Sequence, residues 1–357
     1  MAKILYGIQA EGMGHTTRSK PIIDELSKDN DIILIGSDNV CNYYQNHKDK
    51  IKRLEWVANL KIFYYNNKVS VLGTVIKNLI EVPLHLFSIV KIFILILKER
   101  PDMVITDFEY VSCYLGTLLR IPVISVDNEQ IISKTRIVFN KKHIIDYLNS
   151  RFVLKLELPH ADRYLVTSFF FPIVKDRYTE VYGPVLRDEI INLKTKTGDH
   201  VLVYQTSKSS KTMADIFHNI NENFIVYGFG KDEQDKNITY KKFNEDDFFR
   251  DLGNCKAVIM NGGFTLMTEA LYLKKPILSI PVKFQFEQIL NAEYLANMGY
   301  GASSIEFNEH ETKEFLSNLG KYRKNMKKNI ETGNIRIIKR LKEIIANLKK
   351  QGSRKYL

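Results

Sequence analysis

Short runs of apolar, mostly β-branched residues alternate along the chain with longer stretches in which apolar residues recur every three or four positions. The short runs predict strands, and the longer stretches predict helices. In the first half, the predicted strands span residues 3–9, 31–37, 101–107, 121–127 and 163–168. Because successive positions in these runs are apolar, we expect strands buried on both faces, as in a parallel sheet covered by helices.

The same alternation starts again in the second half. The predicted strands span residues 200–206, 223–229, 237–243, 256–262 and 275–281. The stretch between the two series, residues 186–199, has no strong core pattern and is interpreted as a linker. We therefore expect an α/β protein with a domain at 1–185 and another at 200–332, facing each other across a cleft that holds the ligand.

The last stretch, residues 333–357, is predicted to be a long basic helix that packs back on the first domain. Much of the basic excess of the chain lies between Lys321 and Lys355. A solvated helical face and a role at a membrane surface both fit that distribution.

The most apolar stretch runs from Leu84 to Leu97, where eleven of fourteen residues are apolar. As a helix it would be roughly 21 Å long, which is short of the ~30 Å hydrocarbon core of a bilayer. His85, Ser88 and Lys91 form one narrow polar stripe along it. Our interpretation is a helix buried against a sheet; the alternative is a helix that partly enters a bilayer surface.

Charge and cysteine content limit the kinds of partner and the cellular compartment that we expect. The formal net charge of +11 over 357 residues points to an anionic partner: nucleic acid, a phosphorylated substrate or an acidic membrane surface. The three cysteines, Cys41, Cys113 and Cys255, are far apart and lack metal-ligand spacing, which favours a reducing compartment. The start of the chain has no signal-peptide pattern. We expect a cytoplasmic protein, with peripheral attachment to the inner face of the membrane as an option.

The stretch MNGGFTLMTEAL, from Met260, carries the clearest chemistry. Gly262 and Gly263 lie between a predicted strand and a helix that starts near Phe264 or Thr265. Glycines let the backbone approach a ligand, and the free amides and dipole at a helix start attract phosphate. Glu269 lies about one turn into the helix and could accept hydrogen bonds from two ribose hydroxyls.

A second polar group follows the next predicted strand. Glu287, Gln288 and Asn291 share one face of a predicted helix. A carboxylate and two amides are suited to the hydroxyls of a hexose. Across the sequence, the histidines and cysteines are scattered, and no Asp-x-Asp pair follows a predicted strand. The sequence therefore predicts no metal site and no cofactor, with the helix start neutralising the phosphate charge.

The spacing GG-x-T-x-x-x-EAL-x-x-x-KP-x-L-x-x-P-x-x-x-x-x-EQ-x-x-NA resembles the donor-site signature of GT-B glycosyltransferases. It is similar to the family of the undecaprenyl-linked N-acetylglucosaminyltransferase of peptidoglycan synthesis, the monogalactosyldiacylglycerol synthases and the UDP-glucuronosyltransferases. The signature covers roughly Phe243 to Gly301, and the N-terminal GIQAEGMGHTTRSKPI resembles the glycine loop of the same superfamily. With VITDFEY and SVDNEQ, the resemblance reaches a poorly characterised prokaryotic branch.

The resemblance implies a GT-B fold and inverting transfer of a sugar from a nucleotide diphosphate sugar. Among such donors, the resemblance favours a UDP-sugar. The acceptor would be a hydroxyl on a lipid or a lipid-linked or other glycan. Gly262, Gly263, Phe264 and Thr265 would hold the diphosphate, Glu269 the ribose, and Glu287 and Gln288 the donor sugar, with Asn291 close by. Further implied donor contacts are Phe243 and Asn244 at the base and Ser207, Lys208 and Arg187 at the phosphates. Arg187 comes one residue later than the family spacing.

On the acceptor side, Gly12 and Gly14 let the loop after the first strand pass close to a ligand, and His15 stands at the following helix start. Inverting transfer needs a base for the acceptor proton, and histidine suits that task near neutral pH. Three carboxylates, Asp107, Glu109 and Glu11, could orient His15 or act as the base. Asp127 and Glu129 are weaker candidates.

Other functions remain open at this level. A nucleotide-sugar 2-epimerase of the same architecture would form an epimer without an acceptor. A nucleotide-sugar-binding protein without catalysis would bind the donor and not turn it over. A dehydrogenase is disfavoured because Thr17 stands where the dinucleotide fingerprint needs a third glycine. Nucleic acid is not expected as a partner, because basic and aromatic residues are not interleaved in one patch.

Overall fold

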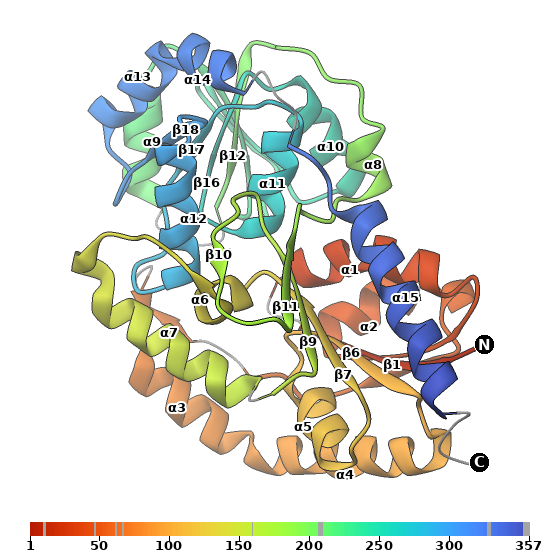
Figure 1. Ribbon diagram of the computed structural model, residues 1–357. Helices are drawn as coiled ribbons and strands as arrows, with labels where there is room; N and C mark the ends of the chain where they lie inside the picture. Colours follow the sequence, from red (N-terminus) through yellow and green to blue (C-terminus); the bar gives the residue numbers. More distant parts are fainter. Residues whose placement is uncertain are drawn as a thin grey trace.

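The computed structural model describes residues 1–9, 12–45, 48–60, 63–65, 68–158, 160–205, 210–326 and 330–352. Two seven-stranded sheets, each covered by helices, lie one above the other in Figure 1. The α/β prediction of two parallel-sheet domains is confirmed.

The first sheet is parallel throughout, with strand order β11-β9-β7-β6-β1-β2-β3. Its strands are β1 (Lys3–Ile8), β2 (Asp31–Gly36), β3 (Arg53–Trp56), β6 (Met103–Asp107), β7 (Val123–Asp127), β9 (Arg163–Thr167) and β11 (Thr179–Tyr182). Two strand pairs lie outside it: β4 (Tyr64–Tyr65) with β5 (Lys68–Val69), and β8 (Thr135–Arg136) with β10 (Ile173–Val174). The edge strands β3 and β11 were not predicted, since neither carries a continuous apolar run.

The second sheet has the order β14-β15-β13-β12-β16-β17-β18 and is parallel except for β14. Its strands are β12 (His200–Tyr204), β13 (Asn223–Tyr227), β14 (Glu233–Asp235), β15 (Ile238–Tyr240), β16 (Ala257–Met260), β17 (Ile277–Ser279) and β18 (Gly301–Ser303). In each sheet a central strand, β6 or β16, ends directly before a polar turn that carries predicted site residues.

The helices alternate with these strands. Those of the first half are α1 (Gly14–Leu26), α2 (Asp38–Gln45), α3 (Val71–Ile80), α4 (Val82–Glu99), α5 (Tyr110–Leu118), α6 (Gln130–Lys134) and α7 (Ile144–Glu157), with 3-10 turns at Lys48–Lys50 and Lys141–His143. Those of the second half are α8 (Asp188–Ile191), α9 (Ser210–His218), α10 (Glu245–Asn254), α11 (Phe264–Tyr272), α12 (Phe286–Asn297), α13 (Glu309–Ser317), α14 (Leu319–Asn325) and α15 (Asn334–Gly352).

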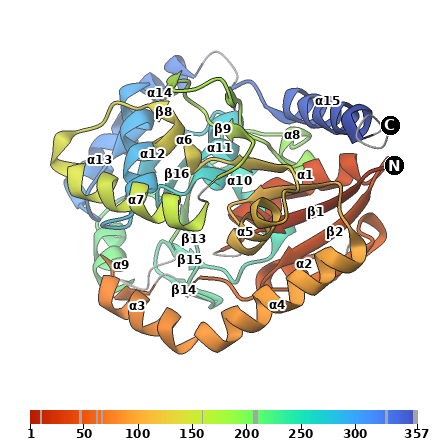
Figure 2. The same cartoon turned by 60° about the horizontal axis from the view of Figure 1, so that its bottom comes forward.

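The last helix, α15, lies beside α1 in both views of the molecule (Figures 1 and 2). Its apolar residues Ile337, Leu341 and Ile345 are buried in one cluster with Ile22 and Ile23 of α1. On its polar side, Lys342 reaches Glu25 at 2.7 Å. The chain thus returns from the second sheet to the first domain, on which α15 packs.

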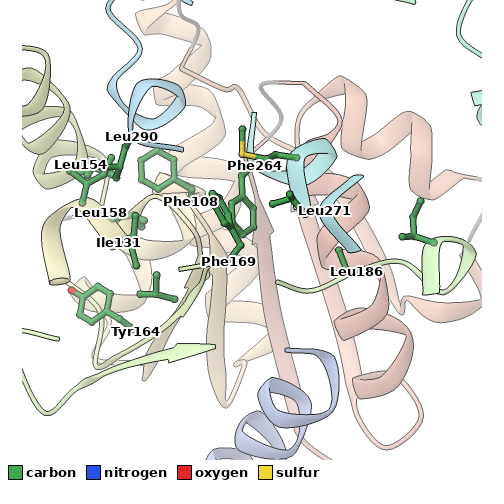
Figure 3. Close-up of a cluster of buried hydrophobic side chains, with 14 of the residues drawn as sticks. Phe108, Ile131, Leu154, Leu158, Tyr164, Phe169, Leu186, Phe264, Leu271 and Leu290 are labelled. Atoms are coloured by element: carbon green, nitrogen blue, oxygen red, sulfur yellow. The ribbon is translucent and has the colours of Figure 1, made fainter. Parts of the chain in front are cut away.

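One hydrophobic cluster runs continuously between the two sheets. Phe108 and Phe169 from the first half pack with Phe264 and Leu290 from the second half (Figure 3). The rings of Phe170 and Tyr294 stack at 3.7 Å on the same boundary. The polar residues at the strand ends therefore face each other above a shared apolar floor.

Helix α4 packs on the first sheet with part of its apolar surface, since Ile92, Leu95 and Ile96 are buried in the core cluster. The polar stripe faces inward: His85 and Ser88 are buried, and Ser88 Oγ accepts a hydrogen bond from the amide of Ala58 at 2.8 Å. Other apolar side chains of α4 face outward, with Phe87 61% exposed and Ile94 59% exposed. The interpretation as a helix buried against a sheet therefore holds for one side of α4, and on that side the polar groups of the stripe also find their partners inside the protein.

Among the described residues, no single helix is both long and apolar enough to cross a bilayer. The segments Gly73–Ile80 and Val82–Glu99, bent by 56° where they meet, reach the required length and composition only when taken together.

Candidate active site at the boundary of the two sheets

The glycine loop after β1 brings His15 to the start of α1. Gly12 has a φ of 77°, a left-handed conformation that glycine adopts without strain. Gly14 begins α1, and its carbonyl accepts a hydrogen bond from Thr265 Oγ of α11 at 3.1 Å. The first turn of α1 therefore meets the first turn of α11, which comes from the other sheet.

Asp107, the last residue of β6, lies under His15. Its Oδ1 is 2.9 Å from His15 Nδ1, and its Oδ2 accepts hydrogen bonds from Arg18 Nε at 2.9 Å and Ser19 Oγ at 3.0 Å. Burial opposes ionisation of this carboxyl, but Arg18 and His15 outweigh burial and lower its pKa to about 2. Asp107 is therefore expected to be an anion at neutral pH, where it can orient the imidazole.

His15 has two tautomers available in this geometry. With the proton on Nδ1, the ring donates to Asp107; with the proton on Nε2, Nδ1 accepts from Arg18 Nη2, which lies 2.7 Å away. Only the first tautomer leaves a lone pair on Nε2. The His15–Asp107 pair thus has the arrangement of a general base and its orienting carboxylate.

Glu109 does not join this pair. Phe108 has a φ of 61°, and this left-handed turn directs Glu109 away from Asp107. Both oxygens of Glu109 accept amide hydrogen bonds at the start of α5, from Val111 at 2.8 Å and from Ser112 at 2.7 Å. In this geometry Glu109 neither orients His15 nor stands as the general base, because both of its carboxylate oxygens cap helix α5.

Glu129, which the sequence ranked low, lies beside His15. Its Oε1 is 3.4 Å from His15 Nε2, and its Oε2 is 3.3 Å from Arg18 Nη2. Burial raises the pKa of this carboxyl to about 7, although Arg18 and His15 oppose the shift. Asp127, which accepts a hydrogen bond from the Gln130 amide, has its pKa raised to about 6 by burial.

Three of these groups could hold a cation together. His15, Asp107 and Glu129 each offer a ligand atom, and these atoms lie within 4.8 Å of one another. A positive charge is already supplied at this place by Arg18, whose guanidinium bonds Asp107 and whose pKa is raised by the surrounding carboxylates despite its burial. The ligand atoms of His15, Asp107 and Glu129 are thus of a kind that can hold a metal ion, but Arg18 already supplies a positive charge next to the two carboxylates.

The start of α11 has the features of an anion site. Its N-cap, Gly263, has no side chain that could occupy the first amides, and no atom lies within 4 Å of the place where a Cβ would stand. Phe264 forms part of the apolar floor, with the Arg18 guanidinium 6.0 Å from its ring centre. Gly263, Phe264 and Thr265 therefore present their backbone to the boundary between the sheets, an arrangement suited to the diphosphate that the sequence predicts.

Gly262 and Gln288, which were expected at the diphosphate and at the donor sugar, bond each other instead. The amide of Gly262 donates to Gln288 Oε1 at 3.2 Å, and the amide of Val282 donates to the same oxygen at 3.0 Å. A Cβ on Gly262 would come within 2.4 Å of the Gln288 carbonyl. Glycine is required here so that α12 can pack closely on the turn before α11.

Glu287 stands at the domain boundary. Its Oε1 accepts hydrogen bonds from Asn128 Nδ2 at 2.8 Å and from Asn291 Nδ2 at 3.2 Å. Asn291 also donates to the Gly262 carbonyl at 3.0 Å, so it fixes α12 to the glycine turn. The predicted sugar carboxylate is thus held from both sheets.

Arg187 and Glu269 form a buried ion pair. Arg187 Nε donates to Glu269 Oε1 at 2.9 Å, and its Nη1 donates to Glu245 Oε1 at 2.6 Å. Burial raises the pKa of Glu269, and Arg187 opposes that rise. The predicted phosphate role of Arg187 is not what this geometry shows: its guanidinium supports the predicted ribose carboxylate.

Phe243 and Asn244 were expected at the nucleobase of the donor. Phe243 is 54% exposed, so its ring face could stack on a nucleobase. Asn244 caps α10, because its Oδ1 accepts a hydrogen bond from the Asp247 amide at 3.1 Å. Glu11, Ser207 and Lys208 lie outside the described residues.

Sequence reasoning missed Arg18 and Asn128. Arg18 follows His15 by three positions, so the two lie on one helical face, and this spacing was the available signal. For Asn128 the signal was its position one residue after β7, at the same sheet edge as Asp107. Neither residue type pointed to chemistry by itself, because arginine and asparagine are common on surfaces.

Comparison with known proteins identifies the family of this chain. The profile of the family described as glycosyl transferase family 1 matches residues 2–320. An uncharacterized glycosyltransferase of Methanosarcina mazei is 26% identical over 335 residues, which cover 84% of each chain. The UDP-N-acetylglucosamine–N-acetylmuramyl-(pentapeptide) pyrophosphoryl-undecaprenol N-acetylglucosamine transferase 3 of Bacillus cereus is 24% identical over 290 residues, 70% of this chain and 76% of that one.

Solved structures share the fold at low sequence identity. MurG of Acinetobacter baumannii superimposes with a TM-score of 0.60 at 12% identity, covering 96% of this chain and 99% of that one. UGT2 of Phytolacca americana, in complex with UDP-2-fluoro-glucose and pterostilbene, has a TM-score of 0.69 at 12% identity, covering 98% and 100%. The predicted GT-B architecture is confirmed.

Proposed function

The chain belongs to glycosyl transferase family 1 and is a glycosyltransferase, and we propose that it moves a sugar from a UDP-sugar to a hydroxyl of a lipid or lipid-linked acceptor, with inversion. The observation that carries the proposal is the meeting of the His15–Asp107 pair with the uncapped start of α11, through the Thr265–Gly14 hydrogen bond. A base and a diphosphate site then stand on the two sides of one anomeric carbon.

In the proposed step, the acceptor oxygen attacks the anomeric carbon and its proton moves to His15 Nε2. The bond from the anomeric carbon to the diphosphate oxygen breaks, and UDP leaves with the electron pair. Asp107 stabilises the imidazolium that forms, and ionised Glu129 adds to that stabilisation. The amides at the α11 start stabilise the charge that develops on the leaving diphosphate.

We expect transfer to proceed without a divalent metal, because Arg18 and the helix start supply the positive charge. Activity measured after EDTA treatment should equal that of the untreated enzyme. A loss on EDTA that returns with Mg²⁺ or Mn²⁺ would assign the His15, Asp107 and Glu129 cluster to a metal instead.

The test of the function is release of UDP from UDP-N-acetylglucosamine, UDP-glucose, UDP-galactose or UDP-glucuronate, with a panel of lipid acceptors. One donor should give acceptor-dependent UDP release, and His15→Ala should abolish it while UDP binding persists. His160→Ala, whose side chain is 64% exposed, is the matched control. Formation of an epimer without acceptor would favour the epimerase, and binding without turnover would favour a non-catalytic protein.

A lipid acceptor is supported by the exposed apolar faces of three helices. Besides α4, they include Ile76, Leu79 and Ile80 on α3, and Ile145, Leu148 and Phe152 on α7, all exposed. Figure 1 shows α3, α4 and α7 on the outer side of the first domain. Aromatic contacts tie α7 to the site, because the Tyr147 ring lies 5.4 Å from that of Phe286, the neighbour of Glu287.

Charge on the same helices favours an anionic bilayer as the partner. Lys77, Lys142, Arg151 and Lys155 are exposed on or beside α3 and α7. Apolar side chains that enter the acyl boundary, flanked by lysine and arginine at the headgroups, are typical of peripheral membrane helices. The protein should therefore sediment with vesicles of phosphatidylglycerol and phosphatidylcholine; absence of sedimentation at low salt would contradict the membrane proposal.

A further inference from the structure

Asn128 occupies a fixed position between two charged groups. It follows β7 directly and is 2% exposed. Its Oδ1 accepts a hydrogen bond from Arg18 Nη1, and its Nδ2 donates to Glu287 Oε1 at 2.8 Å. Because a guanidinium only donates and a carboxylate only accepts, the orientation of this amide is set by its partners.

The hydrogen bond from Asn128 to Glu287 crosses from the first sheet to the second. On the far side, Arg18 also bonds Asp107, the carboxylate that orients His15. One guanidinium therefore touches the partner of the base and the amide that faces the predicted sugar carboxylate. The base site and the sugar site are thus joined through one arginine and one asparagine.

Within its own domain, Glu287 has Asn291 as a donor to the same oxygen, at the longer distance of 3.2 Å. Asn291 is shared with the Gly262 carbonyl. The shorter contact to this oxygen comes from Asn128, so the first domain contributes to the direction of the Glu287 carboxylate.

We propose that Asn128 is a positioning residue that orients Glu287 for the donor sugar, so that sugar recognition requires the two domains to be closed. The inference rests on the proposed function. In the closed arrangement, Asn128 directs one oxygen of Glu287 and Arg18 directs Asn128. Glu287 then recognises the donor sugar only when the His15–Asp107 pair lies beside the same site.

The test compares a nucleotide with and without its sugar. Calorimetry would measure the Kd of UDP, and of UDP-N-acetylglucosamine and UDP-glucose, for wild type and for Asn128→Ala. We expect the Kd of UDP to change less than about twofold and the Kd of the better-bound UDP-sugar to rise about tenfold. The KM for that donor should rise, while the pH profile of kcat keeps its shape. Asn297→Ala, an exposed asparagine of α12, is the control.

A second arm does not depend on the donor. Asn128→Asp keeps the acceptor for Arg18 but places a carboxylate against Glu287, and it should lower the Tm. Adding Glu287→Gln to the same chain lets the new amide donate to the introduced carboxylate, so part of the lost Tm should return. A purely local structural role of Asn128 predicts equal Tm for Asn128→Asp with and without Glu287→Gln.

The outcomes separate the two proposals. Equal loss of UDP and UDP-sugar affinity in Asn128→Ala, or no change in either, would overturn the positioning role. If wild type binds none of these nucleotides, the proposed function fails and the sugar role falls with it, while recovery of Tm in the double variant would still establish the contact between the two side chains.

Discussion

At the residue scale, one buried arginine organises the site. Arg18 bonds Asp107 and Asn128, reaches Glu129, and lies over the ring of Phe264. A buried cation needs opposite charges or hydrogen-bond acceptors around it, and for Arg18 most of these are carboxylates. The same carboxylates then serve the proposed chemistry, because Asp107 orients His15 and Glu129 faces its other nitrogen.

The first prediction concerns the charge of Asp107. Asp107→Asn keeps the shape of the side chain and removes the anion that favours the Nδ1 proton and the imidazolium. We expect kcat to fall by about 10²–10⁴ with the Kd of UDP unchanged, since a positioned base contributes that factor. UDP release and calorimetry measure the two quantities. Asp199→Asn, whose side chain is 90% exposed, should match wild type in both.

The second prediction concerns the pH dependence of stability. Burial raises the pKa of Glu129 from an ordinary value of 4.5 to about 7, so between these values the folded state holds a proton that the unfolded state has lost. The contribution of Glu129 to the free energy of unfolding therefore falls as pH rises through this window. Glu129→Gln cannot titrate, and relative to wild type it should gain on the order of 2 kcal/mol between pH 5 and pH 8. Urea unfolding at both pH values tests this; parallel curves would show that Glu129 ionises normally.

At the element scale, the two glycines before α11 have different roles: Gly262 is needed for packing, and Gly263 lies at the proposed diphosphate site. Gly262→Ala would place a Cβ 2.4 Å from the Gln288 carbonyl, and we expect a loss of about 1–3 kcal/mol in the free energy of unfolding. Gly263 has φ −64° and ψ 133° and open space around it, so Gly263→Ala should fold normally. Its methyl group would stand at the proposed diphosphate site, and UDP affinity should fall about tenfold.

A third glycine gives the control. Gly320 lies in α14 with no atom within 4 Å of the place for its Cβ. Gly320→Ala should leave UDP affinity unchanged and add up to about 1 kcal/mol of stability. If Gly263→Ala bound UDP as tightly as wild type, the α11 start would not be the diphosphate site.

The same scale shows what the sequence could predict. Apolar runs identified the central strands and the helices that follow them, because burial on both faces leaves a strong pattern. They missed the edge strands β3, β11, β14 and β18. They also did not show which apolar residues of α4 stay exposed, because its inward side is set by partners such as Ala58 that are distant in sequence. In the site, motif spacing selected His15, Asp107 and the glycine turn. It could not distinguish Glu109, a helix cap, from Glu129, a neighbour of His15, because that depends on how two strand ends meet in space.

At the scale of the whole molecule, the exposed apolar helices and the closed domains belong to one arrangement. The proposed lipid acceptor, leaving a bilayer at α7, would arrive beside α12, where the Phe286 ring lies 5.4 Å from that of Tyr147 and Glu287 bonds Asn128. Membrane attachment through α7 would thus bring acceptors to the side of the domain boundary where the donor sugar is proposed to bind.

The last prediction tests this attachment with paired variants. Ile145 and Phe152 are seven residues apart on α7, so they lie on one helical face, and each is more than 60% exposed, at 69% and 64%. Changing both to Asp removes apolar burial in the bilayer and adds repulsion from anionic headgroups, so binding to phosphatidylglycerol vesicles should fall at least about tenfold. Ile335→Asp on α15, at an 81% exposed position, should bind vesicles like wild type. UDP affinity should stay the same in all three proteins, because the proposed donor site lies at the start of α11. Equal vesicle binding by the α7 variant would move the attachment to α3 and α4, or remove the membrane from the function altogether if wild type also fails to bind.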